Sequence, residues 1–329
     1  FREWVESSGE RVNPEAWPVV EDRPLLTDNS RAAIRTTEEG RARRADIHEQ
    51  INWVLGDVPP GISADPIRSL SSTRQDYISR FLNRPRVTNG AVRYIAPYNA
   101  MGDYNHAALY YPTDDDGEMI TGESGKLPVM IYLHRYSNTG YDMRTGMDLR
   151  RLFEELLSRG VAVLAMDMTG YGTRIEEAKP FYDRYPNWSR MGKMVEDTRA
   201  AIDALESLEF VDNRRIYLSG YALGGTVSLF TSALDSRVAG TAVSSAFTPL
   251  RTASQDVEGL KAYSHLHGLM PRLGFFADHS DRLPVDFPEV IASIAPRPLL
   301  VIAPELDRHA DADQVEEALQ EVASVYSLY

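Results

Sequence analysis

The 329-residue sequence contains no cysteine. Disulfide bridges and thiolate metal sites are therefore excluded, although this absence alone does not fix the compartment. Basic residues are also scarce, because 35 lysines and arginines stand against 48 aspartates and glutamates, which gives a formal net charge of −13. Binding to a phosphate backbone requires concentrated positive charge, so we expect no nucleic-acid partner.

Long apolar runs are missing as well. No run approaches the roughly 18 residues that a membrane span requires, so we expect no span. The chain starts at Phe1 rather than at a methionine, which fits removal of a signal peptide and a trimmed chain equally well. We favour a secreted or periplasmic location, with the cytoplasm as the alternative. The sequence predicts no cofactor and no metal site, and it leaves the oligomeric state open.

What is present is the composition of a folded globular protein, with 43% hydrophobic and 25% charged residues. The length suits one large domain with a smaller segment attached. We predict an N-terminal extension over residues 1–90, with a helix over 31–55, that packs on an α/β domain over 91–329. Apart from two early strands, at 92–95 and 106–111, the pattern becomes regular only after residue 126.

From residue 127 onward, strand-like apolar runs alternate with helical patterns. Continuous apolar strands that alternate with helices imply a mostly parallel sheet with helices on both faces. The expected strands are 127–134, 162–167, 216–219, 238–244 and 298–303. The expected helices are 147–159, 188–208, 287–294 and 314–329, and a further helix begins with residues 226–230.

The most informative segment is residues 216–225, which read Ile-Tyr-Leu-Ser-Gly-Tyr-Ala-Leu-Gly-Gly. A nucleophile elbow of the form G-x-S-x-G turns an apolar strand sharply into a helix and holds its serine in a strained conformation at the tip. Gly220 and Gly224 occupy the two glycine positions, and Ala222 stands where the serine is expected. A methyl group cannot attack a carbonyl. The alternative is a glycine-rich strand-to-helix turn without catalytic meaning.

Residues that follow the other strands complete a possible site, because the active site of such a sheet lies at the carboxyl ends of its strands. Asp307 follows the strand at 298–303 and is our candidate for the acid of a catalytic triad; its alternative role is to cap the next helix. The backbone amide of Leu223 and that of Arg135 or Tyr136 are the candidates for an oxyanion hole.

A catalytic triad also needs a general base, which is normally a histidine. The triad histidine of an α/β-hydrolase comes after the acid, and His309 is the only histidine after Asp307, at a spacing that fits poorly. We therefore expect the base on a tail beyond Tyr329, and the domain to lack its last strand and helix. His134 is expected to be a structural hydrogen-bonding residue beneath the loop that follows its strand.

These features resemble the carbohydrate-esterase branch of the α/β-hydrolases, which comprises dienelactone-hydrolase-like enzymes, acetyl xylan esterases and glucuronoyl esterases. The resemblance covers residues 125–329 and is most specific at Asp167 to Arg174 and at Leu283 to Leu300. It implies an α/β-hydrolase fold and hydrolysis of a carbohydrate ester, either an acetyl or a uronate ester, by a serine mechanism. Ala222 and the absence of a histidine-bearing tail depart from the family pattern.

Two functional hypotheses follow from the alanine. In the first, the chain is a serine esterase whose nucleophile has been replaced by Ala222, so that a small-molecule or polysaccharide ester is held without turnover. In the second, the chain is a natural binding protein that catalyses nothing. A peptidase or lipase is a further alternative, because one fold hosts many chemistries.

Candidate substrate-binding residues lie close to the strand ends. Tyr171 and Trp188 could stack on a sugar ring, and Arg174 or Arg135 could bind a carboxylate in a bidentate manner. The aromatic residues suit a packed cap equally well, and the arginines suit surface salt bridges equally well.

Overall fold

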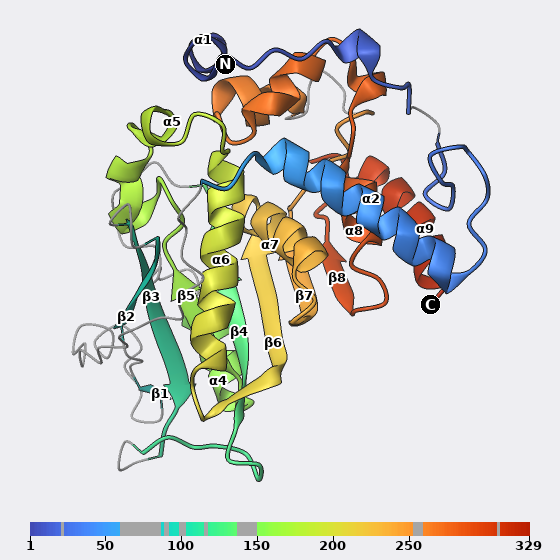
Figure 1. Cartoon of the computed structure of the whole chain (residues 1–329). Coiled ribbons are helices and arrows are strands. Elements are labelled where there is room, and N and C mark those ends of the chain that lie inside the picture. Colours follow the sequence, from blue (N-terminus) through green and yellow to red (C-terminus); the bar gives the residue numbers. More distant parts are fainter. Residues whose placement is uncertain are drawn as a thin grey trace.

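A computed structural model describes residues 1–20, 23–59, 87–88, 92–98, 103–114, 118–136, 150–252, 259–307 and 310–329. The architecture is a twisted sheet with helices packed on both of its faces (Figure 1). Its strands are β1 (Val87–Thr88), β2 (Val92–Tyr98), β3 (Asp103–Pro112), β4 (Leu127–Leu133), β5 (Ala162–Met166), β6 (Val211–Tyr221), β7 (Val238–Ser244) and β8 (Leu299–Ile302).

The sheet is parallel from β5 to β8 and antiparallel at its other end. Its order is β1-β3-β5-β4-β6-β7-β8, and β2 pairs with β3. The pairs of β5 with β4, β4 with β6, β6 with β7 and β7 with β8 are all parallel, whereas β3 is antiparallel to β5, β2 and β1. The carboxyl ends of β4, β6, β7 and β8 therefore meet at one edge, where a site is expected.

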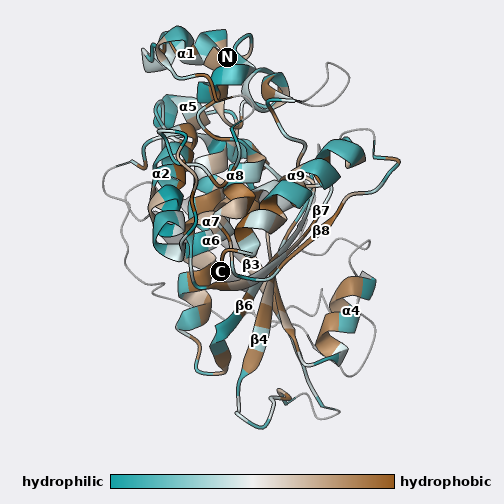
Figure 2. Cartoon of the chain, turned by 90° about the vertical axis from the view of Figure 1, so that its right-hand side faces the viewer, coloured by the Kyte–Doolittle hydropathy of each residue, from teal (hydrophilic) through white to brown (hydrophobic). Residues whose placement is uncertain are grey.

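The helices are unequally divided between the two faces. In the described part of the chain, α4 (Arg150–Ser158) lies on one face, and the larger group lies on the opposite face (Figure 2). That group comprises α2 (Thr37–Leu55), α6 (Arg190–Glu206), α7 (Leu223–Leu234), α8 (Phe287–Ala292) and α9 (Ala312–Tyr326). Two short helices, α1 (Arg2–Ser8) and α5 (Phe181–Arg184), lie near the carboxyl-end edge of the sheet.

Polar side chains at the helix starts explain where several helices begin. Thr36 and Glu39 form a reciprocal capping box at the start of α2, and Asp286 and Glu289 form another at the start of α8. The side chain of Asp311 accepts hydrogen bonds from two backbone amides at the start of α9. Each cap satisfies amide groups that the helix itself leaves without a partner.

The core is continuous across the sheet and the larger helical layer. Fully buried residues include Val129 and Ile131 of β4, Leu218 of β6 and Val227 of α7. Helix α2 packs against α6, α7 and α8, so a segment of the predicted extension contacts the α/β core. In the described residues, no helix combines the length and the apolarity needed to cross a bilayer.

The predicted order and type of the elements are confirmed from β4 to α9, and the fold class is that of an α/β-hydrolase. The largest error among the elements from β4 to α9 is at β6, which begins at Val211 rather than at residue 216. The first residues of β6 include Asp212, Asn213 and Arg214, and their polar side chains lack the apolar pattern that predicts a strand. The strand nevertheless pairs with β4 through Val211 and Leu127. Helix α2 begins at Thr37 rather than at 31 because the capping box fixes its start. The sheet also includes β1, which precedes the predicted boundary at residue 90.

Candidate active site

The turn between β6 and α7 has the backbone geometry of a nucleophile elbow. Ala222 is the residue between strand and helix, and its φ of 49° and ψ of −117° lie in a region that non-glycine residues rarely adopt. Its amide donates to the carbonyl of Ser244 at 2.9 Å, and its carbonyl accepts from the amide of Thr226 at 3.0 Å. The strained conformation is thus held from the neighbouring strand β7 and from the helix.

The elbow glycines are required by close packing. A Cβ on Gly220 would lie 2.5 Å from the amide nitrogen of Gly225, and one on Gly224 would lie 2.6 Å from the carbonyl oxygen of His134. Both distances are too short for real side chains, so the helix can approach β6 and the end of β4 this closely only with glycine at both positions. The pattern G-x-A-x-G is therefore explained by the elbow geometry.

A cavity of about 330 Å³ opens above the elbow. Ala222, Leu223, Arg135, Tyr136 and Asp307 all line it. Four separate segments of the sequence, at the ends of β4, β6, β7 and β8, thus converge on one space, as the carboxyl-end rule predicts. The structure brings together the predicted nucleophile position, the candidate acid and the candidate oxyanion residues.

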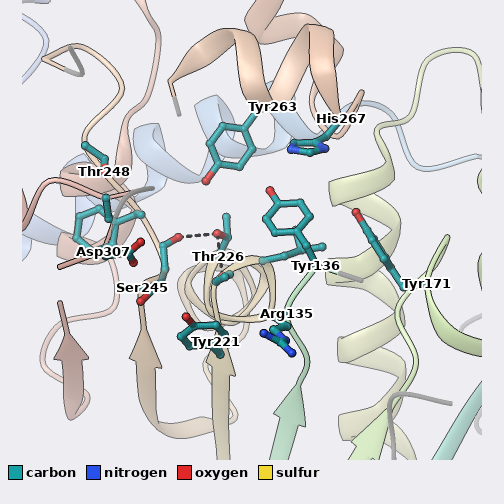
Figure 3. A pocket seen from close by; sticks show the side chains of 15 residues that line it. Arg135, Tyr136, Tyr171, Tyr221, Thr226, Ser245, Thr248, Tyr263, His267 and Asp307 are labelled. Atoms are coloured by element: carbon teal, nitrogen blue, oxygen red, sulfur yellow. Dashed lines mark hydrogen bonds between the residues drawn. The ribbon is translucent and has the colours of Figure 1, made fainter. Parts of the chain in front are cut away.

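One wall of the cavity is polar. Asp307, Ser245 and Thr248 lie on the same side of it in Figure 3. The hydroxyl of Thr226 donates to the carbonyl of Ala246 at 2.6 Å, which fixes the start of α7 against the residues after β7. The candidate base His309 lies outside the described residues.

The opposite wall is aromatic. Tyr136 and His267 have ring centroids 4.8 Å apart, and Tyr136 and Tyr171 have centroids 6.3 Å apart with nearly perpendicular planes (Figure 3). The guanidinium of Arg190 lies 5.8 Å from the centre of the Tyr171 ring. Burial raises the pKa of the Tyr171 phenol, so this hydroxyl stays protonated and available as a donor at neutral pH.

His134 has the structural role that the sequence predicts. Its Nε2 accepts from the amide of Met168 at 3.0 Å, so the proton of the neutral ring is on Nδ1, which lies 2.7 Å from the carbonyl of Arg135 and donates to it. The ring is only 2% exposed. His134 therefore ties the loop after β4 to the loop after β5 and supports Arg135 from below.

Two predicted substrate-binding residues do not line the cavity. Arg174 is buried in an ionic cluster, with Nη1 2.8 Å from Asp197 and Nη2 2.7 Å from Glu177. Although burial opposes its charge, these carboxylates raise the pKa of Arg174, and it stays charged. Trp188 packs in an aromatic cluster with Phe181. Both residues act in the packing of the protein, so neither is retained as a substrate contact, whereas Tyr171 lines the cavity.

Several residues that line the cavity were not expected from the sequence. Ser245 follows β7 directly, so the carboxyl-end rule applied to that strand would have found it. Tyr263 and His267 come from η5 (Ala262–Leu266) and the residue after it, in a stretch with no strand or helix pattern. No sequence signal places this stretch over the elbow.

The cavity places the start of a helix and the tip of the elbow side by side. Leu223 is the first residue of α7 and lines the cavity, so its backbone amide lies at the positive end of the helix dipole. The methyl group of Ala222 stands where an attacking oxygen would be needed. Among the described residues, no group of histidines and carboxylates has the arrangement of a metal site.

Comparison with known proteins identifies related sequences and folds. The family model described as "Glucuronyl esterase, fungi" matches residues 120–328. A Bacillus subtilis (strain 168) protein described as "Putative hydrolase YtaP" is 28% identical over 216 residues, which cover 62% of this chain and 68% of that protein. "Carbohydrate esterase MZ0003", from an unknown prokaryotic organism, is 27% identical over 146 residues, which cover 43% of this chain and 34% of that protein.

Solved structures share the fold. A glucuronoyl esterase from Solibacter usitatus superimposes with a TM-score of 0.71 at 16% identity, covering 95% of this chain and 87% of that one. At this level of identity the superposition establishes the α/β-hydrolase fold, and the family match comes from the sequence.

Proposed function

The chain belongs to the glucuronyl esterase family, whose members are carbohydrate ester hydrolases, and from this premise we propose that its cavity binds a carbohydrate ester, either a uronate or an acetyl ester. The ester carbonyl lies over Ala222 with its oxygen toward the amide of Leu223 and toward that of Arg135 or Tyr136. The sugar packs against the aromatic wall of Tyr136 and Tyr171. Asp307 holds the position of the triad acid.

The observation that carries this proposal is the conformation of Ala222. A φ of 49° is energetically unfavourable for alanine. Such strain persists only where the surrounding structure imposes it, typically at functional sites. Here the strain orients residue 222 toward a cavity that also contains the candidate acid. This backbone geometry is the one that a serine nucleophile requires, and it supports the proposal.

Replacing Ala222 by serine tests the proposal. In the full-length protein, which would supply the general base, the variant is expected to hydrolyse p-nitrophenyl acetate or methyl glucuronate at least about 10³-fold faster than the same protein with Ala222, because loss of a triad residue costs several orders of magnitude. A double variant that also carries Asp307→Asn is the matched control and is expected to lose most of this gain. Both rates are measured under single-turnover and steady-state conditions.

A second candidate function is ester binding without catalysis. Ala222 itself favours it, and His267 is the only histidine that lines the cavity in the described part of the chain. If Ala222→Ser leaves hydrolysis at the level of the parent while both proteins still bind methyl glucuronate, the chain is a binding protein with an esterase fold. If neither protein binds or hydrolyses any sugar ester, the proposed function is wrong.

A further inference from the structure

Ser245 is an unexplained residue beside the elbow. Tyr221 of β6 is paired with Ser244 of β7, so Ala222 and Ser245 are the next residues on two neighbouring strands. The amide of Ser245 donates to the carbonyl of Ile302 on β8 at 2.9 Å, which fixes its backbone at the edge of the sheet. Ser245 therefore lies next to the nucleophile position, on the side of β7.

The conformation of Ser245 is strained like that of Ala222. Its φ is 50°, and Arg31 is the only other non-glycine residue of the described chain, besides these two, with a positive φ. Serine has no steric advantage in the left-handed region, where glycine and asparagine are the usual residues. Two strained residues side by side at the carboxyl edge of one sheet indicate that the strain serves the cavity that both line.

The hydroxyl of Ser245 is also unsatisfied. Its oxygen is buried and makes no hydrogen bond with any described residue. Buried hydroxyl groups almost always have a partner, so an orphaned one requires an explanation. Among the hydroxyl groups that line the cavity, that of Thr226 is satisfied by the carbonyl of Ala246.

The order of the strands indicates which part of a bound ligand Ser245 would contact. β6 lies between β4 and β7. The oxyanion candidates Arg135 and Tyr136 follow β4, so they flank the elbow on one side, and Ser245 flanks it on the other. An ester carbonyl whose oxygen faces the β4 side directs its remaining atoms toward Ser245.

We infer that Ser245 is a ligand-binding residue whose hydroxyl forms a hydrogen bond with an oxygen of the bound sugar ester on the side opposite to the oxyanion hole. This inference rests on the proposed function, because the ligand is the ester that the cavity binds. The polar wall of the cavity thus selects the orientation of the ester, while Tyr136 and Tyr171 on the other wall contact the sugar ring. Ser245 binds and orients, and no covalent step is assigned to it.

Two variants separate the hydroxyl from the strain. Ser245→Ala removes the hydroxyl and keeps the constraint on φ, whereas Ser245→Gly removes both. Ser293→Ala is the matched control, because the hydroxyl of Ser293 is buried, is already bonded to the carbonyl of Val290 at 2.7 Å, and does not line the cavity. The parent chain carries Ala222, so methyl glucuronate is an intact probe whose dissociation constant can be measured by NMR titration.

Loss of one neutral hydrogen bond to a ligand corresponds to a rise of about three- to tenfold in Kd. We expect this rise for both Ser245 variants and no change for Ser293→Ala. Without ligand, Ser245→Ala should keep the Tm of the parent, and Ser245→Gly should raise it. If Ser245→Ala binds methyl glucuronate with the Kd of the parent, the inference is wrong. It is also wrong if Ser245→Ala lowers the Tm by several degrees, because the Ser245 hydroxyl would then form a hydrogen bond within the protein. Failure of the parent to bind any sugar ester refutes the proposed function first and this inference with it.

Discussion

Replacement of Gly224 by alanine gives the sharpest test of the elbow geometry. The added methyl group would overlap the carbonyl of Leu133 and would lie 2.6 Å from that of His134. Both obstacles are backbone atoms, so rotation of a side chain cannot relieve the overlap. Helix α7 and the end of β4 must instead move apart. Overpacking typically costs about 1–3 kcal/mol, and the rigid obstacles place this variant near about 3 kcal/mol.

The size of the Tm change follows from the length of the chain. An unfolding entropy of about 2.1 cal/mol/K per residue gives about 0.7 kcal/mol/K for a chain of this length, so the Tm should fall by about 4 °C. Scanning calorimetry measures this change, and NMR titration measures binding of methyl glucuronate, which should weaken because Arg135 and Tyr136 move with β4. Gly122→Ala is the control, because its Cβ would lie 3.7 Å from the nearest atom, the carbonyl of Lys126. A Gly224→Ala variant with the Tm and affinity of the parent would refute the elbow packing described here.

Two further predictions concern buried ionisable groups. Arg174→Met removes one cationic partner of Asp197, which keeps the ammonium of Lys193 and the hydroxyl of Thr169. The Tm should fall by about 4 °C, since removing one partner of a buried ion pair costs about 3 kcal/mol or more. Arg214→Ala, whose side chain is 94% exposed, should change the Tm by less than about 1 °C, and equal effects of the two substitutions would contradict the assignment. Burial, reinforced by the nearby charges of Arg44 and Arg297, lowers the pKa of His48 below its usual value of 6.5. The stability that neutral His48 contributes is therefore complete above pH 6.5 and is lost as the pH falls through the lowered pKa. Between pH 7.5 and pH 5.0, the free energy of unfolding in urea should fall less for His48→Asn than for the parent. An equal fall for the two proteins would exclude His48 as the cause.

The sequence predicts the sheet well because the signals for its strands are local. Each strand from β4 to β8 contains an apolar run, and the carboxyl-end rule then places Asp307 at the same edge of the sheet as Ala222 without any knowledge of the loops. The elbow itself is readable because its two glycines are required by packing at Gly220 and Gly224. Where a residue type follows from a local steric need, one sequence is sufficient.

The remaining parts of the site depend on tertiary contacts that leave no local pattern. Arg174 is equally suited to a ligand carboxylate and to Asp197, and only the packing of α6 shows that Asp197 binds it. Tyr263 and His267 reach the cavity from an irregular stretch whose position is set by the elements around it. The strain at Ser245 is likewise a property of the assembled edge of the sheet.

The central claim is that the cavity above Ala222 holds a carbohydrate ester with its carbonyl in an oxyanion hole made by the backbone. The most direct test is a crystal structure of this chain with methyl glucuronate, which Ala222 leaves intact. We predict that the ester carbonyl oxygen lies about 2.7–3.1 Å from the amide nitrogen of Leu223 and from that of Arg135 or Tyr136. A ligand bound outside the cavity, or one whose carbonyl points away from Leu223, would contradict the account.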